Sequence, residues 1–467
     1  MNEITVLSTP IPGLLVVELP VHHDNRGWFK ENWQRQKMTA AGVPDFGPVQ
    51  NNVSFNTAVG VTRGFHAEPW DKFVSVATGS VFGAWVDLRA GDAFGACFTT
   101  VIGPDRAVFV PSGVGNAFQT LEPETAYSYL VNDHWSAEAK KSYAFVSLAD
   151  PSLKIEWPIP LDQAELSAAD AEHPDLTAVS PSPRKQTLIL GANGQLGRAL
   201  HRRIPEAIAA GRDRIDLSDP AALTGVNWRE YDTVINAAAY TAVDAAETAD
   251  GRRAAWETNV AAVGRLAEIA RAHRLTLVHV SSDYVFDGTV PEHREDEPFS
   301  PLGVYGQTKA AGDALVATVP RHYIVRTSWV VGEGKNFVAT MASLAQRGTS
   351  PAVVDDQYGR LSFADDIADG ICHLLETGSE FGVYNLTADG EPASWADIAA
   401  YVFELCGRQP SDVRPVSTAE YSAGKTLAPR PPHSSLDLHK LHATGYRPLD
   451  WRAGVRGFLA ASQAASR

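Results

Sequence analysis

The character of the sequence changes near residue 180, and this change constrains the fold more than any other feature. Upstream, short alternating runs such as FVSVATGSVFGAWVDL are separated at short intervals by Gly, Pro, Asn and Asp. That pattern is typical of an all-β sandwich or barrel. Downstream, strand-like runs such as LTLVHVSS alternate with Ala-rich stretches at helical period, as in residues 251–273. This alternation predicts βαβ units and a parallel sheet.

The segment between the β-rich pattern and the alternating α/β pattern is predicted to be a linker. Residues 174–186 (PDLTAVSPSPRKQ) contain three prolines and three small hydroxyl residues, a composition that suits an exposed connection. A chain of 467 residues is also long enough for more than one domain. We therefore expect one domain over residues 1–175, a linker over 176–186, and a second domain over 187–467.

Composition excludes several classes of function. The chain has 40 Lys and Arg against 55 Asp and Glu, a net charge of −15, which argues against nucleic acid as the main partner. Three isolated cysteines (Cys97, Cys372 and Cys406) form neither a disulfide framework nor a CxxC metal motif. The sequence shows neither a signal-peptide pattern nor an apolar run of about 18 residues, so we expect a cytoplasmic protein with no membrane partner.

A glycine-rich turn predicts a dinucleotide site in the second domain. Residues 187–197 read TLILGANGQLG, a strand that enters Gly191-x-x-Gly194-x-x-Gly197 before a helix. Such glycines allow a tight turn and close backbone approach to a pyrophosphate at the helix N-terminus. A structural turn without a ligand is the alternative. The cofactor-binding residues that we expect are Gly191, Asn193, Gly194, Gln195, Leu196, Gly197, Asp216, Leu217, Ala237, Ala238 and Ala239, together with Tyr305 and Lys309.

Residues 305–309 read YGQTK, which places Tyr305 and Lys309 on one face of a helix. We expect the lysine charge to lower the pKa of the phenol and the lysine to hold the cofactor ribose, so that Tyr305 can transfer a proton. Ser282, at the end of a predicted strand, can hydrogen-bond a substrate carbonyl. A strand-end turn serine is the alternative.

Several motifs in the second domain resemble those of dTDP-4-dehydrorhamnose reductases, which are extended short-chain dehydrogenases. They are NAAAYTAVDAAE (236–247), SSDYVFDG (281–288), YGQTK (305–309), RTSWVVG (326–332), NFV (336–338) and DQYGRLS (356–362). The resemblance implies a doubly wound Rossmann fold and hydride transfer from a nicotinamide cofactor to the C4 ketone of a nucleotide-linked 6-deoxysugar. It also implies that Tyr305 is the proton donor, with Lys309 as its partner and Ser282 as the carbonyl hydrogen-bond donor. Tyr240, Asp283 and Trp329 fall on motifs that line the substrate side.

The cofactor is NADPH or NADH, and we favour NADPH. Arg212 follows the second predicted strand of this domain, where it can pair with a 2′-phosphate. A solvated loop arginine is the alternative. Leu361, Ser362, His433 and Ala245 depart from the usual family residues on the substrate side, which leaves the exact sugar open.

The first domain resembles the dTDP-4-dehydrorhamnose 3,5-epimerases. The resemblance rests on DNRGWFKENW (24–33), QNNVSFNTAVGVTRGFHAEPWDK (50–72), VPSGVGNAFQTLE (110–122) and LSAAD (166–170). It implies a cupin-like jelly-roll barrel, a homodimer and a dTDP-4-keto-6-deoxy sugar substrate. The positions matching family residues that hold the nucleotide-sugar are Arg26, Phe29, Glu31, Gln50, Asn52 and Arg63.

The chemistry of a 4-keto sugar assigns roles to four further residues. Protons at C3 and C5 are acidified, so epimerisation needs a base on one face, an acid on the other and a positive group near the enolate oxygen. We expect His66 to be the base, since its ordinary pKa is near neutral. We expect Asp170 to orient His66, and Lys72 to stabilise the enolate. Tyr129 would return a proton to the carbon from the opposite face. The alternative is a packing role for His66 and Tyr129 and a surface role for Asp170.

One substitution separates this domain from the usual pattern. Asn116 stands where the resemblance places a second histidine, and it cannot carry a positive charge. If that histidine binds substrate or tunes the base, the enzyme will be slower or epimerise one carbon instead of two. We expect Asn116 to be one of the substrate-binding residues. We expect no metal site, because the His-x-His pair of metal cupins is missing and His22 and His23 lack ligand spacing.

These features lead to the hypothesis of a fusion of two consecutive enzymes. The first domain epimerises dTDP-4-keto-6-deoxy-D-glucose at C3 and C5, and the second reduces the product at C4 to dTDP-L-rhamnose. One alternative is the same chemistry on a UDP-sugar or with a 6-deoxy-talose-type product. Another is a non-catalytic, nucleotide-sugar-binding regulatory protein. Because the first domain is acidic, we also expect Arg26, Arg63 and Lys72 to gather at its site.

Overall fold

The computed structural model describes residues 4–137, 139–183 and 185–465, and the chain divides after residue 184 into two compact units. The segment predicted as a linker begins within the first unit. Residues 176–178 form a 3-10 turn, and the backbone of Ser182 exchanges hydrogen bonds with Leu88 and Ala90. Strand β14 of the second unit begins at Gln186.

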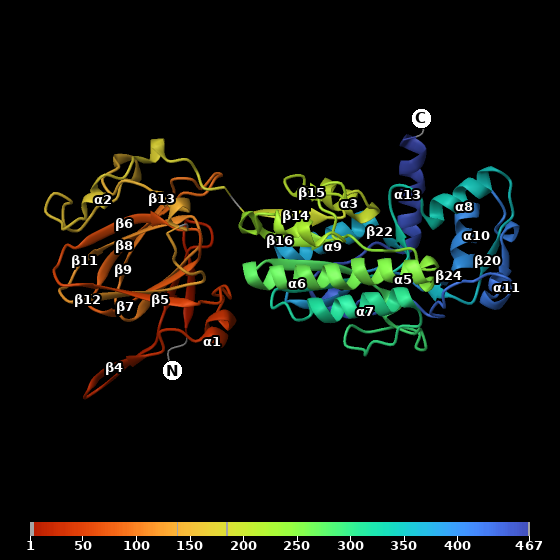
Figure 1. Cartoon of the computed structure of the whole chain (residues 1–467), viewed down its shortest axis with the longest axis horizontal. Helices are drawn as coiled ribbons and strands as arrows, with labels where there is room; N and C mark the ends of the chain where they lie inside the picture. The colour runs from red at the N-terminus through yellow and green to blue at the C-terminus, as the bar shows by residue number, and fades with distance from the viewer. Residues whose placement is uncertain (1–3, 138, 184, 466–467) are drawn as a thin grey trace. The chain divides into compact units, whose positions relative to one another are not determined.

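The first unit consists mostly of antiparallel strands in two sheets (Figure 1). The six-stranded sheet has the order β1 (Thr5–Ser8), β2 (Leu15–Glu18), β10 (Arg106–Val110), β7 (Lys72–Thr78), β12 (Thr125–Val131) and β5 (Gln50–Asn56). The five-stranded sheet has the order β13 (Ala144–Phe145), β6 (Thr62–Ala67), β11 (Val114–Thr120), β8 (Val81–Asp87) and β9 (Cys97–Ile102).

The core of the first unit joins the inner faces of these two sheets. Val74 and Val108 come from the six-stranded sheet, and Trp85 and Phe118 from the five-stranded one. All four side chains are buried, as expected where alternate residues of each strand face inward. The run FVSVATGSVFGAWVDL supplies β7 and β8, which lie in different sheets and so help to close the sandwich.

Short elements complete the first unit. A separate hairpin of β3 (Val21–Asp24) and β4 (Gly27–Lys30) extends from the sandwich (Figure 1). Two short helices, α1 (Arg35–Ala40) and α2 (Ala168–Ala171), lie outside the sheets. The 3-10 turns of this unit are Ala139–Ser142, Pro151–Leu153 and Leu176–Ala178.

The second unit is built on a parallel sheet of six strands. Its order is β15 (Ile208–Ala210), β14 (Gln186–Leu190), β16 (Tyr231–Asn236), β17 (Thr276–Ser282), β18 (His322–Thr327) and β23 (Gly382–Asn385). Each neighbouring pair runs parallel. The strands predicted in TLILGANGQLG and LTLVHVSS correspond to β14 and β17.

Helices cover both faces of this sheet (Figure 1). Leu188 and Leu190 of β14 pack with α6 (Ala262–His273), whereas Ile189 packs with α3 (Gln195–Arg203) and α9 (Ala364–Glu376). Neighbouring residues of one strand thus enter opposite cores, as a sheet buried on both faces requires. The other helices of the central region are α4 (Pro220–Thr224), α5 (Ala249–Trp256) and α7 (Val304–Val316).

The predicted helix over residues 251–273 is interrupted. A π-helical turn, Glu257–Ala261, separates α5 from α6. Within this turn the Asn259 side chain bonds both backbone groups of Tyr240 and the hydroxyl of Thr308, at 2.8–3.1 Å. The turn therefore ties the loop after β16 to α7, and π turns often occur at functional sites.

The remaining elements form a second core of this unit. Val338, Val402 and Val455 are buried in it, on α8 (Phe337–Gln346), α10 (Trp395–Leu405) and α13 (Trp451–Ala465). Its further elements are β19 (Val330–Val331), β20 (Ala352–Val354), β21 (Tyr358–Gly359), β22 (Ser362–Phe363), β24 (Ala393–Ser394), β25 (Arg414–Val416), α11 (Thr418–Ser422) and α12 (His439–Ala443). The 3-10 turns of the unit are Trp228–Glu230, Ala245–Glu247, Asp283–Val285 and Pro410–Asp412. Across the described residues, every helix is too short or too polar to span a bilayer.

Candidate active sites

The first candidate site is built around His66 on β6. Its Nε2 lies 2.8 Å from Oδ1 of Asp170, which α2 supplies. Although burial opposes it, the hydrogen bond and charge of His66 hold the pKa of Asp170 below its ordinary value. An ionised Asp170 accepts from Nε2–H, so Nδ1 is the nitrogen left to take a proton. The geometry suits a base oriented by a carboxylate.

His173 joins this pair, although the sequence analysis did not single it out. Its Nε2 lies 3.9 Å from the same Oδ1 of Asp170, and the two imidazole rings are 5.6 Å apart. Burial, followed by the charge of His66, lowers the pKa of His173. The i, i+3 spacing from Asp170 was the available signal, because residues three apart on a helical turn share a face. Of the described residues, only His66, Asp170 and His173 form a group that could hold a metal.

Lys72 forms an ion pair with Glu68 in this structure. Its Nζ lies 2.5 Å from Oε2 of Glu68, and both side chains are largely buried. The same oxygen accepts a 2.8 Å hydrogen bond from Nε1 of Trp70. Glu68 was not among the residues expected at the site, and its contact with Lys72 was not anticipated. The ammonium is therefore neutralised by a carboxylate within the first unit.

Two tyrosines of β12 lie beside this pair. Burial and the negative charge of Glu68 raise the pKa of Tyr129, with Arg63 opposing. A phenol with a raised pKa stays protonated at neutral pH and can act as an acid. Tyr127 donates a 3.0 Å hydrogen bond to Oδ1 of Asn116, and Asn116 is in register with His66 across β6 and β11. Asn116, which lies opposite His66 in the sheet, therefore holds the Tyr127 phenol in place.

A hollow of about 410 Å³ opens next to these groups. Its lining is aromatic and polar, and includes three residues expected at the site: Gln50, Asn52 and Tyr129. The other lining residues are Val53, Glu68, Trp70, Trp135 and Tyr143. Glu68 faces the hollow and also holds Lys72, so the hollow and the charged pair are continuous.

The nucleotide-sugar residues of the β3–β4 region lie elsewhere in the unit. Arg26 is 83% exposed and pairs with Asp24 of its own hairpin. Phe29 is exposed on β4, and Glu31 pairs with Lys37. None of the three lines the hollow. The expectation that Arg26, Arg63 and Lys72 gather at one site is therefore not met within the described part of one chain: Lys72 is buried, whereas Arg26 reaches solvent.

The second unit contains a close-packed glycine turn between β14 and α3. Gly191 has φ +75°, and a Cβ there would lie 2.6 Å from the backbone nitrogen of Ala238. A Cβ on Gly197 would lie 2.2 Å from the carbonyl oxygen of Gly191. The glycines thus let the turn, the start of α3 and the Ala237–Ala239 segment approach closely, which leaves the first amides of α3 available to an anion. This arrangement fits a dinucleotide pyrophosphate.

The other expected cofactor residues surround this turn. Asn193 donates a 3.2 Å hydrogen bond to Asp213, and Gln195 begins α3. Leu196 and Leu217 are buried and belong to the cores on either face of the sheet. Hydrogen bonds from Ser218 lower the pKa of Asp216. Arg212 follows β15, beside Gly211 and Asp213, and is exposed.

Ser282 and Tyr305 meet at the carboxyl end of β17. Ser282 Oγ–H donates to Oδ1 of Asp283 at 2.8 Å, and the Tyr284 amide donates to Ser282 Oγ at 3.2 Å. Tyr305, in the first turn of α7, is half-buried. Burial raises its pKa to about 12, with a hydrogen bond between the Tyr305 and Ser282 side chains opposing. The phenol is therefore protonated at neutral pH and suited to donate a proton.

Lys309 lies one helical turn beyond Tyr305 and is fully enclosed. Its Nζ donates to the carbonyl oxygen of Val280 at 2.7 Å and lies 3.4 Å from Nε2 of His279. Burial lowers the pKa of Lys309 to about 8, with Asp313 opposing. The expected lowering of the Tyr305 pKa by Lys309 is not seen, because burial is the largest influence on that pKa and raises it.

Asp283 and Trp329 were expected to line the substrate side, but Asp283 is buried and Trp329 packs against other protein residues. Asp283 is 3% exposed, and burial raises its pKa to about 6. Trp329 has φ +45°, a left-handed conformation rare for a bulky residue. Its ring stacks on Trp395 at 3.8 Å, and a Cβ on Gly359 would lie 2.9 Å from it. Trp329 is thus held by its neighbours in a fixed position, and sequence reasoning missed Trp395.

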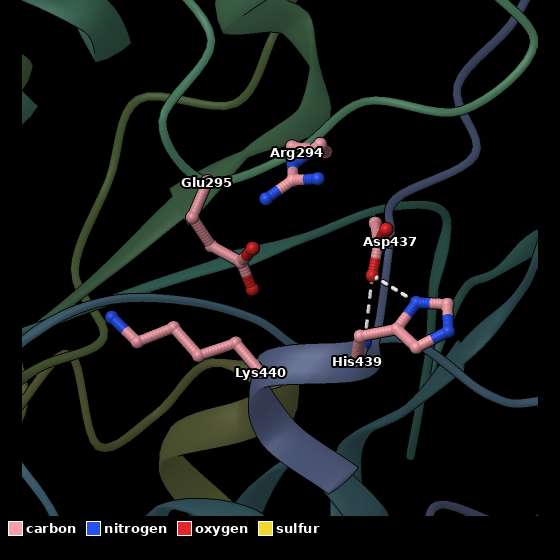
Figure 2. Close-up of a pocket in the computed structure, with 5 residues that line it drawn as sticks. All are labelled: Arg294, Glu295, Asp437, His439 and Lys440. Carbon is pink, nitrogen blue, oxygen red and sulfur yellow. Dashed lines mark hydrogen bonds and ion pairs between the residues drawn. The ribbon is translucent and has the colours of Figure 1, made fainter. Parts of the chain in front are cut away.

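A second hollow, of about 270 Å³, lies in the same unit away from the residues named above. Figure 2 shows its lining: Arg294, Glu295, Asp437, His439 and Lys440. Asp437 accepts hydrogen bonds from the amide and ring of His439, and Lys440 donates to the carbonyl of Val383. Arg294 pairs with Asp296 outside the lining, and Glu295 accepts from the Asn385 amide, so each charged group of the hollow already has a partner.

Two protein families match the chain. The family described as "dTDP-4-dehydrorhamnose 3,5-epimerase" matches residues 8–178, and the one described as "RmlD substrate binding domain" matches residues 185–464. The chain is 54% identical over 176 residues to "Protein RmlC homolog" of Streptococcus pyogenes serotype M6, covering 37% of this chain and 88% of that protein.

The second unit has relatives of its own. The chain is 38% identical over 294 residues to the dTDP-4-dehydrorhamnose reductase of Aggregatibacter actinomycetemcomitans, covering 58% of this chain and 98% of that protein. A crystal structure of the Bacillus anthracis dTDP-4-dehydrorhamnose reductase in complex with NADP is 30% identical, with a TM-score of 0.55. That similarity covers 60% of this chain and 99% of the other.

Proposed function

The chain belongs to the dTDP-4-dehydrorhamnose 3,5-epimerase family through its first unit and to the dTDP-4-dehydrorhamnose reductase family through its second, and we propose how it joins the two reactions. It is a bifunctional enzyme of dTDP-L-rhamnose synthesis. The first unit inverts C3 and C5 of dTDP-4-keto-6-deoxy-D-glucose, and the second reduces the C4 ketone with NAD(P)H. The epimerised ketone is the substrate of the reductase, which gives the fusion a chemical rationale.

The finer fold assignments follow from the same premise. We assign the first unit to the cupin-like jelly rolls, supported by its two packed sheets of mostly antiparallel strands. We assign the second to the doubly wound Rossmann folds, supported by a parallel sheet with helices on both faces and a glycine turn after its first strand. The domain limits that we propose are 1–183 and 186–467, because Leu176, Val179 and Ser182 pack on the first unit and β14 begins at Gln186, so the linker is shorter than the predicted 176–186.

In the epimerase, His66 takes the proton from the carbon next to the ketone. Its free Nδ1 accepts the proton, and the ionised Asp170 stabilises the imidazolium that results. The electron pair moves onto the C4 oxygen to give an enolate. The Lys72 ammonium has three N–H donors, so while one is held by Glu68 beside the hollow, another stabilises that oxygen by a hydrogen bond. Tyr129 then donates its phenolic proton to the opposite face of the carbon, which inverts it.

In the reductase, residues of this chain position the ketone and supply its proton. A bound dihydronicotinamide would supply the hydride that reaches C4. Gly191, Gly194 and Gly197 would hold the pyrophosphate, and Lys309 the nicotinamide ribose. Ser282 hydrogen-bonds the C4 oxygen, and Tyr305 donates its proton to that oxygen as the alcohol forms. Asp283 and Trp329 border the substrate side. The cytoplasm, which supplies NAD(P)H, is the compartment we propose.

The exposed hairpin of the first unit suggests a homodimer. Arg26, Phe29 and Glu31 belong to the nucleotide-sugar motif but do not line the hollow of their own chain. The edge strand β5 presents Val53, which is 63% exposed, beside that hollow. We propose that the hairpin of one subunit completes the hollow of its partner. Mixing inactive His66→Ala and Arg26→Ala chains should then restore exchange activity; no restoration in mixed dimers would refute the shared site.

The observation that carries the proposal is the presence of both chemical sets in one chain: His66 with Asp170, and Ser282 with Tyr305 and Lys309. The test uses dTDP- and UDP-4-keto-6-deoxyglucose with NADPH, followed by product NMR. We expect turnover of the dTDP-sugar to the L-rhamnose configuration. Preference for the UDP-sugar, or a talose product, would favour the alternative enzyme. If the purified chain neither oxidises NADPH nor exchanges deuterium into the sugar, the result favours a non-catalytic binding protein.

A further inference from the structure

Three side chains with metal-ligand chemistry converge in the first unit, although the sequence alone predicts no metal site. His66 comes from β6, and Asp170 and His173 come from α2 and the turn that follows it. Their ligand atoms all lie within 4.8 Å of one another. Nε2 of His66 is 2.8 Å, and Nε2 of His173 3.9 Å, from the same oxygen of Asp170.

These separations suit a small tetrahedral ion. Zinc binds imidazole and carboxylate at about 2.0–2.2 Å, which places neighbouring ligand atoms about 3.4 Å apart. The two distances to Asp170 bracket that value, and the two imidazole ligand atoms lie within 4.8 Å of each other, so modest side-chain movements bring all three atoms to that spacing. Two imidazoles and one carboxylate are also the donor set of open zinc sites, whereas Mg²⁺ and Ca²⁺ prefer oxygen.

The surroundings hold the ligands while leaving one side open. Asp170 and His173 are 9% and 11% exposed at their side chains, whereas His66 is 35% exposed. Phe145 packs against both imidazoles, with ring centroids 5.5 Å from His66 and 4.7 Å from His173. An ion can therefore enter from the His66 side and keep a fourth position for water.

We propose that His66, Asp170 and His173 form a binding site for a divalent transition metal of the zinc class, and that occupancy inhibits the epimerase. Binding displaces the proton from Nε2 of His66 to solvent and replaces the hydrogen bond to Asp170 with metal bonds. The imidazole then holds an ion whose charge opposes protonation of Nδ1, so His66 no longer acts as a base. The inhibition, but not the binding, rests on the proposed epimerase function.

The test uses the whole chain, stripped of metal with a chelator, and two probes. Zn²⁺ binding is followed by calorimetry, and Co²⁺ binding by its visible absorption, which distinguishes tetrahedral from octahedral coordination. His173→Gln removes one ligand, and His22→Gln is the matched control because His22 is exposed on β3. Deuterium exchange into the 4-keto sugar, without NADPH, reports epimerase activity.

We expect one tight ion per chain, a tetrahedral cobalt spectrum, and at least a 10-fold loss of exchange that the chelator reverses. His173→Gln should weaken binding by more than about 100-fold, beyond the usual cost of losing a second-shell partner, while His22→Gln binds like wild type. If His173→Gln fails to fold, a Zn²⁺-dependent rise in the unfolding temperature of wild type, absent in Asp170→Asn, provides the same evidence.

Other outcomes would refute either the metal site itself or only the inhibition that we attribute to it. An octahedral spectrum, weak binding, or affinity lost in His22→Gln and kept in His173→Gln would show surface binding and refute the site. Tight His173-dependent binding without inhibition would refute the inhibitory role. If metal-free wild type exchanges no deuterium at all, the epimerase assignment fails, and the binding data still decide the site.

Discussion

Oγ of Ser282 lies 2.8 Å from Oδ1 of Asp283, and the Tyr284 amide donates to the same Oγ. A serine hydroxyl has one proton, so an ionised Asp283 keeps that proton from the substrate ketone. Burial raises the pKa of Asp283 to about 6. A protonated Asp283 can instead donate to Oγ, which frees the Ser282 proton for the C4 oxygen.

This relationship predicts the pH dependence of ketone reduction. The active form has Asp283 protonated, so kcat should rise as pH falls through about 6. Asp283→Asn keeps a permanent N–H donor beside Ser282 and should remove that transition. The measurement is kcat against pH, from about pH 5 to about pH 9, with pre-epimerised ketone. Groups that face Asp283 include the half-buried Tyr284 and Tyr305 and the buried Ser434; an unchanged transition near pH 6 in Asp283→Asn would assign it to another group.

Tyr305→Phe removes the proton donor and leaves the ring. We expect a loss of reduction of about 10²–10⁴-fold, the usual contribution of a positioned acid, because a phenol protonated at neutral pH donates to the C4 oxygen. Deuterium exchange at C3 and C5 should continue at the wild-type rate. Loss of both activities in a folded variant would contradict two separate sites.

Asp170→Asn tests the carboxylate that orients His66. An amide cannot stabilise the imidazolium, so we expect exchange to fall about 10²–10⁴-fold while reduction of pre-epimerised ketone persists. His66→Ala should have at least as large an effect. Exchange at the wild-type rate in His66→Ala would remove His66 as the base.

The contact between Glu68 and Lys72 predicts a coupling in stability. Glu68→Gln leaves the Lys72 ammonium buried without its carboxylate, at a cost of about 3–5 kcal/mol in the free energy of unfolding of the first unit. The double variant Glu68→Gln, Lys72→Met should recover much of that loss. Urea unfolding of the four proteins of the cycle gives the coupling energy. Additive effects within about 0.5 kcal/mol would mean that the pair is not coupled.

Arg212 tests the choice of cofactor. A guanidinium after β15 can pair with the 2′-phosphate of NADPH, whereas NADH lacks that group. We expect Arg212→Ala to raise KM for NADPH about 10-fold, as for loss of one charge-assisted contact, and to leave KM for NADH nearly unchanged. Equal changes for both cofactors would place Arg212 outside the phosphate site.

Local patterns were enough to predict the strands and the two architectures. FVSVATGSVFGAWVDL became β7 and β8, and LTLVHVSS became β17, because β-branched and aromatic residues between turn-forming residues favour strands. The glycine turn was predictable because only glycine tolerates the contacts at Gly191 and Gly197. The π turn at residues 257–261 was not, because it depends on Asn259 bonding two distant segments.

The unpredicted site residues all depend on contacts between segments or on burial. Glu68 and His173 lie near expected residues in sequence, but their pairing with Lys72 and Asp170 needs the folded geometry. The raised pKa of Tyr305 likewise follows from enclosure, which spacing alone does not reveal. The stacking of Trp395 on Trp329 joins residues that are far apart in the chain.

The central claim is that one chain both epimerises and reduces the same sugar. The most direct measurement is NMR of the product formed from dTDP-4-keto-6-deoxy-D-glucose and NADPH in D₂O by the purified chain. We predict dTDP-L-rhamnose with deuterium at C3 and C5, taken from solvent, and protium at C4, delivered by the cofactor. A reduced product that keeps protium at both C3 and C5, or no reduction at all, would contradict the claim.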